Sequence, residues 1–109
     1  MYLIGCDIGT QNTKSVLVDE NGVVICEATR EYEVNTPRPN WAEQWPDIWV
    51  KAAFETIKEV VEKSNVAKKE IAGVAVSGLY GGAGIPVDRD VKPLYPCLIW
   101  MDRRAVKET

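Results

Sequence analysis

A short polar segment near the start of the chain has residue types that could hold a phosphate. Asp7-Ile8-Gly9-Thr10-Gln11-Asn12-Thr13-Lys14 separates two apolar runs. A tight hairpin with a glycine can expose backbone N–H groups to a phosphate, because no Cβ blocks the approach. Asp7 could hold a hydrated Mg²⁺, and Lys14 with the hydroxyls of Thr10 and Thr13 could neutralise phosphoryl oxygens. The alternative is an ordinary hairpin with solvated side chains, since the segment is neither a Walker A loop nor a dinucleotide-binding fingerprint.

Cysteine and histidine narrow the possible chemistry. The three cysteines, Cys6, Cys26 and Cys97, are far apart, odd in number and not in a metal-ligand spacing. Each lies among apolar residues, so we expect plain buried thiols. The chain has no histidine, which excludes histidine-based zinc binding and acid–base catalysis within it.

Composition and charge indicate the broad class of protein. The chain has 109 residues, of which 46% are hydrophobic, and this suits one domain, or part of one, with a buried core. Its net charge of −3 gives no electrostatic reason to expect nucleic acid or an anionic membrane as a partner. No stretch approaches the ~20 apolar residues of a membrane span, and no signal-peptide pattern opens the sequence. The expected compartment is the cytoplasm.

The elements that must position the polar segment are strands. Residues 2–6 read as a buried strand and residues 13–18 as a second one. The turn that follows contains Asn21-Gly22, a strong hairpin signal. Residues 23–34 alternate between apolar and polar side chains, which is typical of a strand with one solvated face. We therefore expect a three-stranded antiparallel meander.

A helix and a further strand are expected next. After a loop over residues 36–46, apolar residues recur at three- and four-residue steps from Pro46 to about Ser64-Asn65, opposite a mixed-charge face that we expect to be solvated. We expect Trp41, Trp45 and Trp49 to pack the loop onto this helix. Residues 71–76 form an apolar run that reads as a buried strand.

The last third of the chain has weaker signals. Residues 85–88 read as a short strand before a turn at Arg89-Asp90, and Asp102 could cap a last helix. The order is β-β-β-α-β with further short strands, and no internal repeat is present. Because the expected last helix runs to Thr109 without a closing cap, we expect the chain to be a fragment of a longer protein.

Three motifs together resemble one family. Asp-x-Gly-Thr at residues 7–10 resembles the first phosphate loop of the sugar kinase, heat-shock ATPase and actin superfamily. Pro-Arg-Pro-Asn-Trp-Ala-Glu-Gln-Trp-Pro-Asp-Ile-Trp at residues 37–49 resembles the Pro-x-x-x-Trp-x-Glu-x-Asp-Pro-x-x-Trp segment of FGGY carbohydrate kinases. Ile99-Trp100-Met101-Asp102-Arg103-Arg104 resembles the Trp-x-Asp-x-Arg segment at that family's sugar site. We term residues 99–104 the acceptor segment. One departure is Trp45, which replaces the usual Asp before the helix proline and should alter capping.

The resemblance implies a fold and an activity. The fold would be α/β of the ribonuclease-H-like type, a mixed sheet with flanking helices, and residues 1–109 would be part of the amino-terminal kinase domain. The full protein would transfer the γ-phosphoryl group of ATP to a small sugar or polyol, with Mg²⁺ and possible homodimer formation. The catalytic base and adenosine site would lie beyond residue 109, so residues 1–109 alone should be inactive. The alternative is a non-catalytic, actin-like nucleotide-binding or interaction module.

The resemblance also implies roles for individual residues. Asp7 would organise Mg²⁺, directly or through water, and Lys14 would neutralise charge during transfer. The residues expected to meet the nucleotide phosphates are Gly9, Thr10, Gln11, Asn12 and Thr13. The residues expected to face the acceptor are Leu79, Tyr80, Gly81, Trp100, Asp102 and Arg104. Asp102 and Arg104 also have an alternative interpretation, in which Asp102 caps a helix and Arg104 pairs with an acid.

Residues 78–82 bear on the choice of acceptor. Glycerol kinases have a segment that resembles Gln-Arg-Glu around this position and xylulose kinases one that resembles Gln-Met-His-Gly, whereas this chain has Gly78-Leu79-Tyr80-Gly81-Gly82. Tyr80 could offer a hydroxyl and a ring face to a polyol, or it could be a core tyrosine beside a glycine turn. Because the segment carries no charge, we expect a ketopentose such as xylulose, or a related short polyol, and not glycerol.

Overall fold

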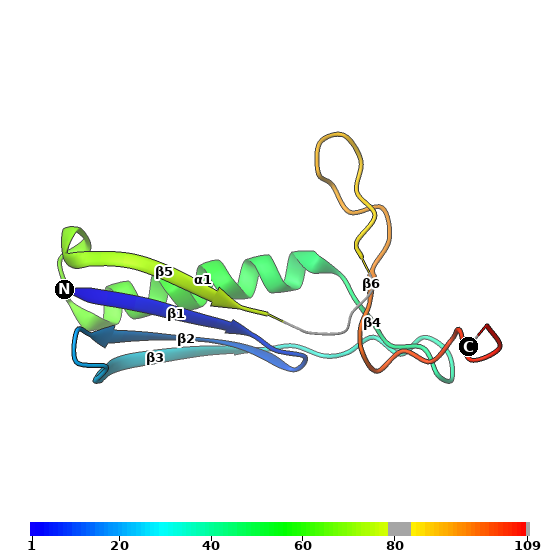
Figure 1. Cartoon of the computed structure of the whole chain (residues 1–109), viewed down its shortest axis with the longest axis horizontal. Helices are drawn as coiled ribbons and strands as arrows, with labels where there is room; N and C mark the ends of the chain where they lie inside the picture. Colours follow the sequence, from blue (N-terminus) through cyan, green and yellow to red (C-terminus); the bar gives the residue numbers. More distant parts are fainter. Residues whose placement is uncertain (79–83, 109) are drawn as a thin grey trace.

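The computed structural model describes residues 1–78 and 84–108 and contains a mixed four-stranded sheet with one long helix (Figure 1). The sheet has the order β3-β2-β1-β5, in which only the β1–β5 pair is parallel. A separate two-stranded sheet joins β4 to β6 in antiparallel pairing. The elements are β1 (Tyr2–Ile8), β2 (Asn12–Asp19), β3 (Val24–Glu31), β4 (Glu43–Gln44), α1 (Pro46–Ser64), the 3₁₀ turn η1 (Lys68–Glu70), β5 (Ile71–Ser77) and β6 (Cys97–Leu98). The expected antiparallel meander is confirmed.

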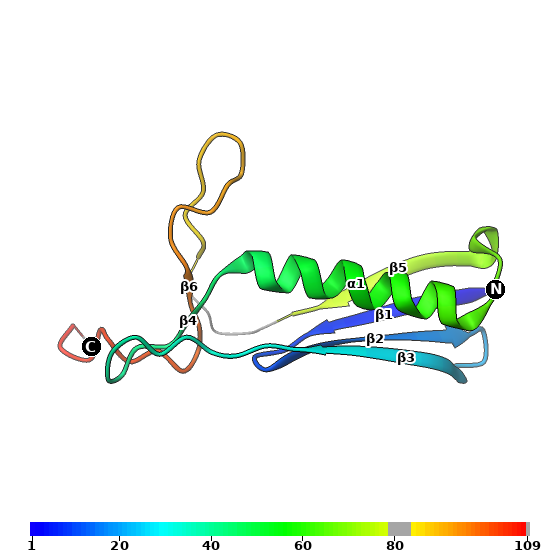
Figure 2. The ribbon, with the colours of Figure 1, turned by 180° about the vertical axis from the view of Figure 1, so that it is seen from behind.

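Helix α1 covers one face of the sheet and forms the core with it (Figure 2). Ile4, Leu17, Ala28 and Val60 are buried together between the two layers, and burial of each larger side chain stabilises the fold by roughly 1.5–3 kcal/mol. A buried hydrogen bond of 2.8 Å between the Ser15 and Thr56 hydroxyls joins the sheet to the helix. The core therefore holds the strands that carry the polar segment.

The ends of α1 follow the sequence signals. Pro46 occupies the first turn, where its missing N–H leaves no intrahelical hydrogen bond unmade. Trp45 is the N-cap residue and makes no side-chain capping hydrogen bond, as expected from the replacement of an Asp. Asn65 ends the helix in the left-handed conformation, with φ of 55°. None of the described helices is long and apolar enough to span a membrane.

The prediction that β1 and β5 are buried strands is wrong for the face of β1 that points away from α1 and for most of β5. In β1 only the side chains that point toward α1 are buried, as with Ile4 and Cys6. Strand β5 lies at the edge of the sheet and is mostly exposed, with Val76 62% accessible. The reason is the placement of α1, which packs mainly over β2 and β3, while nothing in the described part of the chain covers the other face.

Three other expected boundaries differ from the structure. Strand β3 ends at Glu31, opposite Asn12 at the start of β2, and not at residue 34. Residues 85–88 contain only an isolated bridge between Val87 and Pro93. Residues 104–108 form turns and not a helix, and such a short segment does not offset the cost of helix nucleation.

Residues 84–96 form an arm that projects from the sheet in both views (Figures 1 and 2). The radius of gyration is 16.6 Å, compared with about 13 Å for a compact domain of this length. The arm and the small β4–β6 sheet therefore extend beyond the core.

The turn at the tip of the arm has the same architecture as the β2–β3 turn. In each turn an aspartate, Asp19 or Asp88, accepts backbone N–H bonds from residues two and four positions later through Oδ1. In each, the residue three positions after the aspartate has a positive φ. That residue is Gly22 in the first turn (φ 80°) and Val91 in the second (φ 61°). A β-branched residue is strained in this region of φ/ψ space, whereas glycine is not.

We expect Val91→Gly to stabilise the full-length protein by about 1 kcal/mol, because it removes this strain. Val91 is 75% exposed, so little packing is lost. The reciprocal control, Gly22→Val, should destabilise by about 1–2 kcal/mol. Urea unfolding of the three proteins measures both effects, and a destabilised Val91→Gly variant would contradict the strain assigned to Val91.

Candidate functional site

The β1–β2 turn comprises residues 9–11, because β1 runs through Ile8 and β2 begins at Asn12. Asp7 therefore lies inside a strand and not in the turn. The Gly9 N–H donates to Asn12 O at 2.8 Å. A Cβ on Gly9 would lie 3.0 Å from the same carbonyl oxygen, so glycine is needed here for close backbone approach and not for a positive φ.

The carbonyl groups of the β1–β2 turn are bound by the rest of the protein. The Tyr32 hydroxyl donates to Gly9 O, the Gln44 Nε2–H donates to Thr10 O at 2.7 Å, and the Tyr32 N–H donates to Gln11 O at 2.9 Å. Burial raises the pKa of the Tyr32 phenol, and the nearby Asp7 adds to this effect, so the hydroxyl keeps its proton. The backbone N–H groups of Thr10 and Gln11 have no acceptor among the described residues. The turn thus presents amide donors, which suit an anion.

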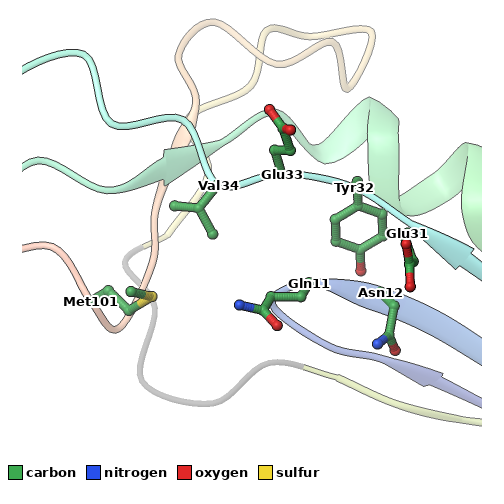
Figure 3. Close-up of a pocket in the computed structure, with 7 residues that line it drawn as sticks. All are labelled: Gln11, Asn12, Glu31, Tyr32, Glu33, Val34 and Met101. Carbon is green, nitrogen blue, oxygen red and sulfur yellow. The ribbon is translucent and has the colours of Figure 1, made fainter.

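Thr13 and Asn12 are placed differently from Thr10. Thr13 is buried and its hydroxyl bonds to the Tyr32 hydroxyl at 3.0 Å, so it supports the turn and is not placed to meet a phosphate. Asn12 and Gln11 line a cavity of about 700 Å³ on one side of the turn (Figure 3). The other lining residues are Glu31, Tyr32, Glu33, Val34 and Met101. Its two glutamates make this cavity a poor site for a phosphate and a better one for a neutral, hydroxylated molecule.

Asp7 and Lys14 lie opposite each other on the open face of the sheet. Lys14 Nζ forms an ion pair with Glu27 at 3.1 Å, whereas Asp7 has no hydrogen-bond or ion-pair partner within residues 1–78 and 84–108. Both line a smaller cavity of about 340 Å³ that extends to Ser77 of β5. On the face of the sheet that points away from α1, the carboxylate of Asp7 and the amino group of Lys14 therefore lie in the strands next to the turn that presents the amide donors.

The donor set at Asp7 fits a hydrated Mg²⁺. No cluster of three or more His, Cys, Asp or Glu residues that could hold a metal occurs among the described residues. Mg²⁺ usually keeps several water ligands and binds through one or two carboxylates together with substrate phosphates. A single free carboxylate beside a turn that presents amide donors meets this requirement.

The structure brings the acceptor segment against the β1–β2 turn. The indole Nε1–H of Trp100 donates to Thr10 Oγ1 at 2.9 Å, although the two residues are 90 positions apart in the sequence. Half of the Trp100 side chain remains exposed. Leu79, Tyr80 and Gly81, the other expected acceptor residues, lie outside the described residues.

Asp102 and Arg104 are engaged with the protein itself. Asp102 accepts the Ala42 N–H at 2.8 Å, and Arg104 joins Asp102 to Glu43 through ion pairs of 2.8 and 2.9 Å. The Arg104 guanidinium also lies 3.7 Å from the centroid of the Trp41 ring. The alternative in which Arg104 pairs with an acid is confirmed. The Arg104 N–H donates to Asp102 Oδ1, but the described residues that follow form turns, so the prediction that Asp102 caps a helix is wrong. A contact of either residue with an acceptor stays a prediction.

The three tryptophans of residues 41–49 have different surroundings. Trp41 stacks on Arg104, and its ring centroid lies 5.0 Å from the Arg38 guanidinium. Trp45 is 43% exposed. Trp49 fits the prediction better, since from α1 it donates its Nε1–H to Gln44 Oε1. Trp41 thus makes a long-range cation–π contact that the sequence did not indicate, and packing of Trp41 and Trp45 onto the helix stays a prediction.

Sequence reasoning did not single out Tyr32, Glu43 or Gln44. Tyr32 follows the third strand of the meander, and the other two lie in the family-like segment at residues 37–49. Of these two, only Glu43 stands at a fixed position of the motif, so Gln44 carried no signal. The contacts that give these residues a role join distant parts of the chain.

Acidification should selectively weaken the Asp102–Arg104 cluster. Hydrogen bonding from Arg104 lowers the pKa of Asp102 from 3.8 to about 2; burial opposes this shift and the Ala42 amide supports it. A carboxyl with a depressed folded-state pKa contributes stability above its unfolded pKa and loses it as pH falls through its folded pKa. The contribution, roughly 2 kcal/mol, should thus disappear between about pH 5 and pH 2.

Denaturant unfolding of the full-length protein and of Asp102→Asn measures this difference. The gap in unfolding free energy between the two should be largest near pH 6 and shrink below pH 4. The exposed Glu62→Gln serves as a control and should show no such gap. A gap that does not change with pH would contradict the ion pair's contribution.

The sequence matches one family of known proteins. A model for the N-terminal domain of the FGGY family of carbohydrate kinases matches residues 2–109. The xylulose kinase of Bacillus subtilis (strain 168) is 35% identical over 107 residues, which are 98% of this chain and 21% of the relative. The glycerol kinase of Thermococcus gammatolerans is 32% identical over 107 residues, which are 97% of this chain and 21% of the relative. The names of these two relatives point to different acceptors.

Solved structures give the same family and the fold. The crystal structure of a "xyloylose kinase" from Brucella ovis matches with a TM-score of 0.91 and 32% identity, over 99% of this chain and 22% of that chain. The predicted α/β fold of the ribonuclease-H-like type is thereby confirmed. The chain spans about a fifth of the length of the relatives it matches.

Proposed function

The chain belongs to the FGGY family of carbohydrate kinases, and from that premise we propose that the full-length protein transfers the γ-phosphoryl group of ATP to a hydroxyl of a small sugar or polyol. Residues 1–109 would be part of its amino-terminal domain. The single observation that carries the proposal is the hydrogen bond between Trp100 and Thr10, because it joins the acceptor segment to the phosphate-binding turn. Phosphoryl transfer depends chiefly on holding donor and acceptor in alignment.

Each part of the turn has a role in this proposal. The free N–H groups of Thr10 and Gln11 bind phosphate oxygens, and Gly9 permits the close backbone approach that shapes the turn. Lys14 adds positive charge after exchanging Glu27 for a phosphate oxygen. Asp7 would hold a hydrated Mg²⁺, which would supply positive charge beside the phosphates. Trp100 offers its exposed ring to the carbon skeleton of the acceptor.

The proposal predicts sugar-dependent ADP release by the full-length protein with Mg²⁺ and ATP. A coupled ADP assay over a panel of pentuloses, tetritols and glycerol measures it, and residues 1–109 alone, assayed in parallel, should release none. ADP release that ignores every sugar, or nucleotide binding without turnover, would instead favour the non-catalytic nucleotide-binding module. Clear turnover by residues 1–109 alone would contradict the assignment of the catalytic base to the remainder of the protein.

A further inference from the structure

Strand β4 lies between the β1–β2 turn and the acceptor segment (Figure 1). It consists of Glu43 and Gln44 alone, and both side chains are buried. Successive residues of a strand point to opposite sides. Accordingly Gln44 reaches the turn, while Glu43 reaches Arg104 of the acceptor segment.

Gln44 uses all of its polar atoms within the fold. Its Nε2 group donates to Thr10 O at 2.7 Å and to Glu33 O at 3.2 Å, and its Oε1 accepts from Trp49 Nε1 at 3.2 Å. These three bonds fix the turn to the segment that follows β3 and to the first turns of α1. The position of Thr10 therefore depends on the position of β4.

On the other side of β4, Arg104 joins this strand to the acceptor segment. It is 16% exposed and bridges two carboxylates, those of Glu43 and Asp102, while stacking on Trp41. Backbone bonds from Ile99 N–H to Ala42 O and from Arg103 N–H to Asn40 O pair the two segments along their length. The acceptor segment is thus fixed to residues 40–43 by side chains and backbone together.

The Trp100–Thr10 bond closes these contacts into a ring. The ring runs from Thr10 through Gln44 and Glu43 to Arg104 and Asp102, and along the backbone to Trp100. In a closed ring the turn and the acceptor segment cannot shift independently. A misplacement of 1 Å between reacting groups can cost about 10²-fold in rate.

We propose that Gln44 and Arg104 are positioning residues that fix the acceptor segment relative to the phosphate-binding turn. The inference rests on the proposed function. It departs from the expectation that Arg104 faces the acceptor, since the guanidinium is occupied by two carboxylates and a ring.

Kinetics of Arg104→Lys in the full-length enzyme test the proposal. Lysine keeps the charge but is a point donor that cannot bridge two carboxylates and stack as a plane. We expect kcat to fall by about 10- to 100-fold for every acceptor, with KM for acceptor and for ATP changed by less than about threefold. Arg30→Lys is the matched control, because Arg30 also bridges two carboxylates, Glu55 and Glu59, both on α1. Its kcat should stay within about twofold of the parent value.

A second variant keeps the test decisive if Arg104→Lys does not fold. Trp41→Leu removes the stacked ring but leaves both ion pairs, and it should lower kcat in the same direction by a smaller factor. Unchanged kcat in folded Arg104→Lys would overturn the proposal. A rise in KM for the acceptor alone, with kcat unchanged, would also overturn it, because that pattern indicates direct contact with the acceptor.

Hydrogen exchange provides a readout that does not depend on activity. The N–H groups of Gly9 and Tyr32 bond to Asn12 O and Gln11 O, so their protection reports on the integrity of the turn. Arg104→Lys should speed exchange at both amides severalfold, whereas Arg30→Lys should not. Unchanged exchange would overturn the link between Arg104 and the turn. A wild-type protein with no sugar-dependent turnover would refute the proposed function and the catalytic part of this inference, while exchange would still decide the link itself.

Discussion

Asp7→Ala in the full-length protein should lower kcat by ~10²–10³ while leaving the fold intact, because it removes a group that organises charge at the transferring phosphoryl. Asp7 is exposed and has no partner among the described residues, so its loss leaves no buried group unpaired. Steady-state kinetics at saturating acceptor and across a range of Mg²⁺ concentrations measure the effect. The Mg²⁺ concentration that gives half-maximal turnover should also rise.

Glu20→Ala is a matched control for this experiment. Glu20 is another exposed carboxylate, but it lies at the far end of β2 beside the N-terminus. Its replacement should leave both kcat and the Mg²⁺ requirement unchanged. Near-normal turnover of folded Asp7→Ala at saturating Mg²⁺ would show that Asp7 does not have the assigned role.

Acceptor-varied kinetics should show a preference for a ketopentose such as xylulose, or a related short polyol, over glycerol by at least ~10² in kcat/KM. A site that hydrogen-bonds particular hydroxyls can reject an analogue lacking them by up to ~10⁴–10⁵. A small triol has few contacts, so a glycerol site needs strong polar groups near its hydroxyls. In the proposed site, Gly78-Leu79-Tyr80-Gly81-Gly82 would supply no charge for that purpose, and its glycines would leave room for a longer carbon chain.

Tyr80→Phe is the variant that tests this segment. It should lower kcat/KM for the favoured acceptor by about 1 kcal/mol or more of transition-state binding and leave ATP affinity unchanged. If kcat/KM of Tyr80→Phe for the favoured acceptor were unchanged, the Tyr80 hydroxyl would not contribute to acceptor binding. If glycerol were the best acceptor, the prediction of a longer acceptor would be wrong.

The elements that the sequence predicted well are those set by local interactions. The Asn21-Gly22 turn and the boundaries of α1 depend on residues within a few positions of each other, such as Asp19 with Gly22 and Pro46 with its own helix turn. The position of the β1–β2 turn is local for the same reason, since Gly9 needs only Asn12 across the hairpin. These features could therefore be found from spacing and residue type.

The elements that the sequence did not predict depend on contacts between distant segments. Exposure of β5 follows from where α1 lies over the sheet, which no pattern within residues 71–77 encodes. The engagement of Arg104 with Glu43 joins residues 61 positions apart, and that of Gln44 with Thr10 joins residues 34 positions apart. Thr13 has a type suited to phosphate binding, but the alternation of β2 turns its side chain toward the core.

Identification of the phosphorylated product tests most directly the claim that the β1–β2 turn and the acceptor segment form one phosphoryl-transfer site. The full-length protein is incubated with Mg²⁺, ATP and the favoured acceptor, and the products are followed by ³¹P NMR. We expect a phosphomonoester of the acceptor that appears in step with ADP and is nearly abolished by Asp7→Ala. Release of inorganic phosphate alone, or ATP left intact with every acceptor, would contradict it.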